Sequence, residues 1–337
     1  MALSEFEIIR RNFTARGIRR GDVAVGIGDD GAVVRFPPDC DLVTVVDTLV
    51  AGVHFPPDAR PEDIGHKALA VNLSDVAAMG AVPAWATLAL TLPHSDEIWL
   101  SAFARGFFDL AEQYGVQLVG GDTTRGPLTV TVQVQAWVHN GQAVRRSGAR
   151  PGDIIFVTGT VGDAGLALRV WQRGVEIPAP HADYLFSRLH RPIPRCREGE
   201  ALCGVASAMI DVSDGLAADL GHMLEASGVG ATLNMDEIPL SPSFSAVSAV
   251  EEDLVDEAAR WRLALSAGDD YELCFTAPAA QRHRVEALFS QFACGCRAIG
   301  LIEKAPGLRL QQSDGTLLVL QSSGYDHFAQ DPSNAGE

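Results

Sequence analysis

The chain has 337 residues, 47% of them hydrophobic and 20% charged, and its 43 acidic and 26 basic side chains give a formal net charge of −17. This composition is typical of a globular protein long enough for two domains. The negative charge disfavours nucleic acid and anionic membrane surfaces as partners, because both would repel it. No apolar run approaches the ~20 residues of a membrane span, and the acidic N-terminal residues do not resemble a signal peptide.

The six cysteines include no C-x-x-C pair and follow no regular spacing. Such cysteines are typical of reduced thiols in a reducing compartment. We therefore expect the protein to be cytoplasmic, and we expect neither a membrane nor a nucleic acid among its partners.

The first half of the chain predicts a mixed sheet with helices. Ser4, followed by Glu7, is typical of a helix start, and Leu128–Val138 alternates apolar and polar residues like a half-buried antiparallel strand. A short apolar run predicts a buried strand that ends at Asp47, and residues 116–119 predict a strand that leads into a Gly-Gly-Asp loop. The predicted helices of this half cover residues 4–16, 61–79 and 96–114.

The Gly- and Pro-containing stretch 148–153 predicts a domain junction. Beyond it, strands and helices alternate again, and Asp214 is placed to cap a helix that runs to residue 226. The other predicted elements of this half are strands 154–158, 208–211 and 271–276, and helices 163–171, 182–189 and 280–291. We expect an α+β (mixed α/β) protein with an N-terminal domain at 1–147 and a C-terminal α/β sandwich at 148–337.

Short carboxylates recur beside glycines or small polar residues at the predicted ends of strands and helices. They are Asp30, Asp47, Asp75, Asp122 and Asp211. One Asp of this kind is usually a turn residue or a cap. Five in one chain indicate one shared site, and close carboxylates repel unless cations intervene. Oxygen ligands favour Mg²⁺ or Ca²⁺. Because neither a Walker P-loop nor a kinase-type lysine motif is present, a nucleotide would bind through metal-bridged phosphates.

Longer motifs carry a family resemblance. They are Gly26–Ala32, Asp47–Phe55, Lys67–Asp75 with Met79–Ala81, Gly120–Thr123, Asp211–Leu216 and Gly268–Leu273. In this order they resemble the thiamine-monophosphate kinases, and the similarity runs from near Phe6 to Phe328. The resemblance implies the fold of the aminoimidazole-ribonucleotide-synthetase-like ATP-binding superfamily and a homodimer whose N-terminal sheets pair. It also implies ATP-dependent phosphorylation of thiamine monophosphate to thiamine diphosphate by direct in-line transfer, assisted by several Mg²⁺ ions.

Residue roles also follow from the resemblance. The Mg²⁺ ligands would be Asp30, Asp47, Asp75, Asp122, Asp211 and Asp214. ATP would contact Asp30, Gly121, Asp122, Arg146 and Ser213. The thiamine side would be lined by His54, Asp269 and Tyr325, where an aromatic face and a carboxylate suit a cationic thiazolium.

The chain departs from the family pattern at a few positions. Val45 and Val46 stand where hydroxyl residues often precede the metal-binding Asp47, so only backbone carbonyls could bind metal there. Arg105 aligns with an aromatic residue that can lie near adenine, and Asp269 replaces a frequent Glu with a shorter carboxylate.

Other functions remain open at this stage. A selenophosphate synthetase or an aminoimidazole ribonucleotide synthetase would share the superfamily, although the first of these would carry a reactive Cys near the N-terminus, and none of the first 39 residues is Cys. A metal-dependent phosphohydrolase would use the same carboxylates without ATP. A non-catalytic acidic protein would bind divalent ions without turnover.

Overall fold

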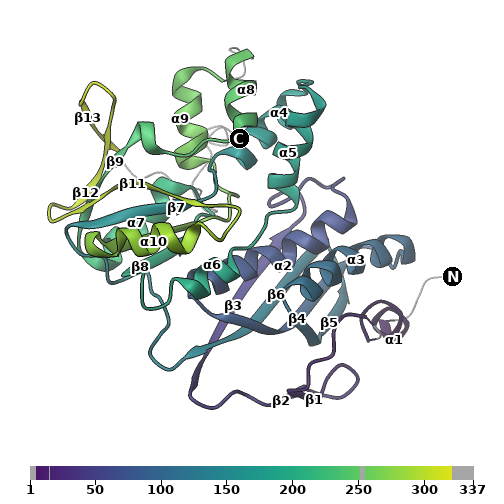
Figure 1. The fold of residues 1–337 in the computed structure, drawn as a ribbon. Coiled ribbons are helices and arrows are strands. Elements are labelled where there is room, and N and C mark those ends of the chain that lie inside the picture. The colour runs from purple at the N-terminus through teal and green to yellow at the C-terminus, as the bar shows by residue number, and fades with distance from the viewer. Residues whose placement is uncertain (1–4, 15, 251–254, 321–337) are drawn as a thin grey trace, which may run out of the picture.

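The computed structural model describes residues 5–14, 16–250 and 255–320, which form two mixed sheets and the helices around them (Figure 1). The first sheet has the order β3-β6-β4-β5, and the second has the order β13-β12-β9-β11-β7-β10-β8. A two-stranded ribbon, β1 (Val23–Val25) with β2 (Val33–Val34), precedes them. The mixed α/β class with two domains is therefore confirmed.

The four-stranded sheet is covered by helices on one face. It contains β3 (Cys40–Val50), β4 (Val82–Leu92), β5 (Gln117–Arg125) and β6 (Thr129–His139). Alternate residues of β6 are buried against helices α2 (Pro61–Ala78) and α3 (Glu97–Gln113), as a strand of period two requires. β6 pairs antiparallel with both β3 and β4, as its alternation predicted.

The opposite face of this sheet carries no helix of the described chain (Figure 1). Leu42 and Val46 on this face of β3 are 56% and 58% exposed, whereas Val43 and Leu49 face the helices and are buried. The prediction of a buried strand that ends at Asp47 was therefore wrong, because β3 is an edge strand with one uncovered face and runs on to Val50.

The second sheet lies between helices. Its strands are β7 (Asp153–Thr158), β8 (Ala208–Asp211), β9 (Gly230–Asn234), β10 (Leu273–Pro278), β11 (Cys296–Glu303), β12 (Gly307–Gln311) and β13 (Leu317–Leu320). Every residue of β7 is buried: Ile154 and Phe156 share a core with α10 (Arg282–Phe289), and Ile155 and Val157 share another with α7 (Leu216–Ser227). The short helix α6 (Cys196–Ala201) packs against α2 and so joins the two sheets.

A third, smaller core unites four helices beside the second sheet (Figure 1). They are α4 (Asp163–Arg173), α5 (Ala179–His190), α8 (Pro242–Val250) and α9 (Glu257–Ser266). No helix among the described residues is both long and apolar enough to cross a membrane.

Three local predictions were wrong. The first helix does not run regularly to Arg16: α1 (Glu5–Ile9) continues as a π-helical turn, Arg10–Thr14. The Gly-Gly-Asp motif lies inside β5 rather than after it, because β5 pairs with β4 over its whole length. Helix α7 begins after Gly215, and no side chain caps it, so Asp214 is not its cap. Ser4 lies outside the described residues.

Candidate functional site

Four of the predicted acidic residues line one cavity of about 490 Å³ between the two sheets. Asp47 comes from β3, Asp75 from α2, Asp211 from the end of β8 and Asp214 from the turn that follows β8. Ser74 fixes one of them, because its hydroxyl donates a 2.7 Å hydrogen bond to Asp211 Oδ2. The tertiary structure thus brings together carboxylates that lie far apart along the chain.

The electrostatics of this cavity are unfavourable for free carboxylates. Burial, followed by the negative charges of Asp211 and Asp214, raises the pKa of Asp47 to about 6. Burial and the neighbouring charges of Asp211 and Asp47 also raise the pKa of Asp75. A nearby cation would remove this repulsion, since an opposite charge favours the ionised form.

Asp219 on α7 supports this site from behind the cavity wall without lining the cavity, and sequence reasoning missed it. Its Oδ2 accepts hydrogen bonds of 3.0 Å from the backbone N–H groups of both Ser213 and Asp214. These bonds hold the turn that presents Asp214. Asp219 follows Asp214 by five residues, on the first turn of the helix, and that proximity was the available signal.

Lys67, to which the sequence analysis gave no role in the site, also lines this cavity. Lys67 on α2 is almost completely buried, and its Nζ lies 3.0 Å from Asp269 Oδ2 and 3.4 Å from the backbone oxygen of His54. The hydroxyl of Tyr271 donates to the other oxygen, Asp269 Oδ1, at 2.9 Å. His54 Nδ1 accepts from the backbone N–H of Val50, so in the neutral ring the proton is on Nε2.

The segment that carries Asp269 is conformationally restrained. Asp269 and Tyr271 have φ values of 60° and 50°, in the left-handed region that non-glycine residues seldom occupy. Hydrogen bonds from Asp269 N to the Ser213 carbonyl and from Gly162 N to the Asp270 carboxylate hold this backbone. Strain of this kind persists only where the surroundings enforce it, and it is common at ligand sites.

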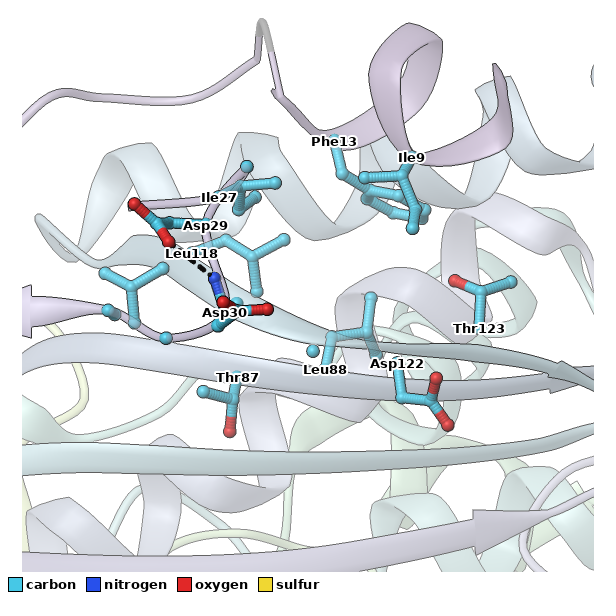
Figure 2. Close-up of a pocket in the computed structure, with 16 residues that line it drawn as sticks. Ile9, Phe13, Ile27, Asp29, Asp30, Thr87, Leu88, Leu118, Asp122 and Thr123 are labelled. Carbon is cyan, nitrogen blue, oxygen red and sulfur yellow. Dashed lines mark hydrogen bonds between the residues drawn. The ribbon is translucent and has the colours of Figure 1, made fainter. Parts of the chain in front are cut away.

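The remaining acidic candidates line a second cavity of about 620 Å³. Figure 2 shows Asp30 on the loop after β1 and Asp122 on strand β5. The backbone N–H of Asp30 donates a 2.9 Å hydrogen bond to Asp29 Oδ1. Gly121 has a φ of 156°, and a side chain there would collide with the backbone oxygen of Leu88 on β4. Only glycine permits this close approach of the two strands.

The sequence had suggested one shared site for the six acidic residues, but they line two different cavities of the chain. β3, which carries Asp47, and β5, which carries Asp122, are the two edges of the four-stranded sheet. Three strand spacings of ~4.8 Å separate these edges. One ion cannot contact both side chains in a single copy.

The other candidates have distinct positions. Ser213 lines the first cavity. Arg146 lines neither cavity, but its charge lowers the pKa of both Asp75 and Asp211 against the dominant effect of burial, so it lies near them. Arg105 is paired with Glu62 on the surface of α3. Tyr325 lies outside the described residues.

The donors fit Mg²⁺. Across the described ranges, no three His, Cys, Asp or Glu side chains approach closely enough to form a complete metal centre. Mg²⁺ suits such a site, because it commonly binds one or two carboxylates together with waters and substrate phosphates. The repulsion among Asp47, Asp75 and Asp211, which adds to burial in raising the pKa of Asp47 and Asp75, is consistent with this, since a bound cation would relieve it.

Comparison with known proteins decides the family. Residues 28–138 match the family model "AIR synthase related protein, N-terminal domain", and residues 150–313 match "AIR synthase related protein, C-terminal domain". The thiamine-monophosphate kinase of Salmonella typhimurium is 47% identical over 331 residues, which cover 98% of this chain and 99% of the relative. The chain belongs to the thiamine-monophosphate kinase family.

Solved structures of thiamine-monophosphate kinases share this fold. The crystal structure of the Stenotrophomonas maltophilia K279a kinase has a TM-score of 0.83 and 46% identity, covering 94% of this chain and 98% of that one. The solved complex "AaThiL complexed with AMPPCP and TMP" has a TM-score of 0.76 and 32% identity, covering 90% and 92%. The resemblance drawn from the sequence motifs is confirmed.

Proposed function

We propose that the protein transfers the γ-phosphoryl group of ATP directly to the phosphate of thiamine monophosphate, giving thiamine diphosphate and ADP. The observation that carries this proposal is the convergence of Asp47, Asp75, Asp211 and Asp214 in one cavity of a thiamine-monophosphate kinase fold. A relative was solved with an ATP analogue and TMP together, which supports both substrates.

Two phosphate-bearing anions must meet in a chain with a net charge of −17, so positive charge has to be supplied. We assign Mg²⁺ to the six candidate carboxylates, Asp30, Asp47, Asp75, Asp122, Asp211 and Asp214. When bound, Mg²⁺ neutralises phosphate oxygens and aligns the donor with the acceptor.

The side chains of this site act by binding and orientation. Arg146, near Asp75 and Asp211, supplies direct positive charge to the ATP phosphates, and Ser213 contributes from the turn after β8. Gly121 and Asp122 form the wall of the second cavity on the nucleotide side. We assign His54, Asp269 and Tyr325 to the thiamine side.

The reaction requires no general base. A phosphate monoester is largely doubly ionised near pH 7, because its second pKa is ~6. An oxygen of the acceptor phosphate therefore attacks the γ-phosphorus in line, while the bond to the β–γ bridging oxygen breaks and ADP leaves. The rate acceleration then comes from positioning and charge stabilisation, with no covalent enzyme intermediate.

We also propose that the protein is a homodimer formed through the uncovered face of the four-stranded sheet. Leu42 and Val46 are exposed there, and such apolar surface is typical of an interface. In this arrangement the N-terminal domain, residues 1–147, forms the dimer interface and binds ATP and Mg²⁺. The C-terminal domain, residues 148–337, completes the nucleotide and substrate site.

One assay tests the function. Purified protein is mixed with MgATP and thiamine monophosphate, and thiamine diphosphate and ADP are quantified; equal amounts of both are expected. Selenide with ATP, and formylglycinamidine ribonucleotide with ATP, test the two synthetase alternatives. Release of inorganic phosphate from thiamine monophosphate without ATP would instead identify a phosphohydrolase, and absence of any turnover would refute the kinase assignment.

A further inference from the structure

Lys67 is the only lysine or arginine among the described residues that line the first cavity. Five carboxylates line the same cavity, namely Asp47, Asp75, Asp211, Asp214 and Asp269. The Lys67 side chain is only 5% exposed, so its ammonium group is largely shielded from water. Burying an ammonium group is costly unless it has partners.

The partners of Lys67 leave part of its hydrogen-bonding capacity available. An ammonium group has three N–H donors. Within the described residues, the acceptors near Nζ are Asp269 Oδ2 at 3.0 Å and the backbone oxygen of His54 at 3.4 Å. One donor therefore remains for a ligand in the cavity that Lys67 lines.

Asp269 is already engaged on both carboxylate oxygens. Oδ2 faces Lys67 Nζ, and Oδ1 accepts from the hydroxyl of Tyr271. Its negative charge is thus met by Lys67 before any substrate arrives, which makes it a poor independent counter-charge for a thiazolium. A carboxylate fixed at both ends is suited to orienting the ammonium group.

The backbone around Asp269 strengthens this interpretation. Its φ of 60° is held by the hydrogen bond from Asp269 N to the Ser213 carbonyl, which lies next to Asp214. The next residues anchor the segment: Asp270 accepts from Gly162 N, and Glu272 is paired with the buried Arg188 and the partly buried Arg195. These hydrogen bonds and ion pairs therefore fix the backbone that places Asp269 beside the cavity with four of the six predicted metal ligands.

We propose that Lys67 binds the phosphate group of the acceptor, a phosphate monoester carried by a cationic heterocycle, and that Asp269 and Tyr271 are positioning residues for its ammonium group. The inference rests on the proposed function and assigns the acceptor phosphate rather than ATP. The reason is direct contact: Lys67 Nζ pairs with Asp269 and lies near the backbone oxygen of His54, two residues assigned to the thiamine side. Of the residues assigned to ATP, Ser213 shares this cavity, whereas Asp30, Gly121 and Asp122 line the other one.

The direct test is Lys67→Met, which keeps the long apolar stem and removes the charge. Lys304→Met is the matched control, because Lys304 is exposed and is the only other lysine of the chain. Loss of a hydrogen bond to a charged group should raise the KM for thiamine monophosphate ~10- to 100-fold. The KM for ATP should change less than twofold, and the control should match the unmodified protein.

Direct binding gives a second measurement that needs no turnover. Calorimetry with thiamine monophosphate and with unphosphorylated thiamine reports how much affinity the phosphate contributes. Lys67→Met should lose most of the preference for the phosphorylated ligand, and Lys67→Arg should keep part of it. An unchanged preference in a folded Lys67→Met protein would overturn the proposal.

The positioning role is tested at Asp269, which also covers the case in which Lys67→Met does not fold. Asp269→Asn keeps the shape but removes the charge that orients Lys67, so it should raise the same KM while leaving the KM for ATP unchanged. Asp269→Glu should restore most of the affinity. If the two residues act as one unit, the double variant Lys67→Met/Asp269→Asn should have a KM for thiamine monophosphate no higher than that of Lys67→Met alone.

The outcomes separate this inference from the proposed function. If the unmodified protein forms no thiamine diphosphate, the function itself fails. If it does form the product and the variants at Lys67 and Asp269 impair ATP use instead, then the acceptor-phosphate assignment is wrong while the function stands. If the two substitutions act additively, the positioning role of Asp269 is wrong.

Discussion

Replacement of Glu272 by Gln should strongly destabilise the part of the protein built around the seven-stranded sheet. Glu272 is fully buried and accepts from Arg188 Nη2 at 2.8 Å, Arg195 Nε at 2.7 Å and Thr158 Oγ1 at 2.6 Å. Gln would keep the shape but leave two buried guanidinium groups without their shared counter-charge. Breaking a buried ion pair from one side typically costs ~3–5 kcal/mol, so the thermal midpoint should fall by about 10 °C.

The pH dependence of this effect has a definite sign. Burial alone would raise the pKa of Glu272, but the charges of Arg195 and Arg188, together with the hydrogen bonds from Arg195 and Thr158, hold the pKa below its usual value of 4.5. The stabilisation is therefore fully present above the unfolded pKa, near 4.5, and is lost as the pH falls through the lower folded pKa. The difference in the free energy of unfolding between the unmodified protein and the Glu272→Gln variant should be constant at pH 6–8 and should shrink below pH 4.5.

Urea unfolding followed by circular dichroism measures the free energy, and differential scanning fluorimetry measures the midpoint. Glu237→Gln is the matched control, because Glu237 pairs with Arg297 at the surface, where both side chains are about half exposed. Exposed pairs contribute ~0–1 kcal/mol. If Glu272→Gln destabilises no more than this control, the reasoning about the buried pair is refuted.

Further predictions concern catalysis, packing and assembly. Asp122→Asn should lower turnover by ~10²-fold or more without a change in thermal midpoint, and near-normal kinetics at saturating Mg²⁺ would contradict its assigned role. Chelation with EDTA should abolish thiamine diphosphate formation, and excess Mg²⁺ should restore it. Gly106→Ala should destabilise the protein to urea by ~1–3 kcal/mol, since the added Cβ would collide with the backbone oxygen of Glu62 on α2; an unchanged midpoint would argue against that helix contact. Val46→Arg should convert dimer to monomer in sedimentation experiments, whereas a dimer that persists would place the interface elsewhere.

The local sequence was sufficient to predict most elements, because the spacing of apolar residues distinguishes helices from strands. Helix α2 begins at Pro61 and α3 is capped by Asp96, whose side chain accepts from Ile98 N and Trp99 N. The alternation of β6 predicted its antiparallel pairing. Burial was harder to predict: nothing within the run at 42–47 indicates that β3 lies at the edge of its sheet with one face uncovered.

For the site, the sequence alone identified the kinase family and predicted metal-binding chemistry, because carboxylate oxygens recur in turns in the same order as in that family. Only the tertiary structure decided which carboxylates meet, because Asp47 and Asp75 approach Asp211 through the packing of two sheets, whereas Asp122 lies on the far edge strand. It also revealed the ion pair on which the proposed role of Lys67 rests. The sequence around Lys67 does not indicate an ionic partner. The ion pair with Asp269 forms only in the folded protein, where α2 lies against the strained segment after α9.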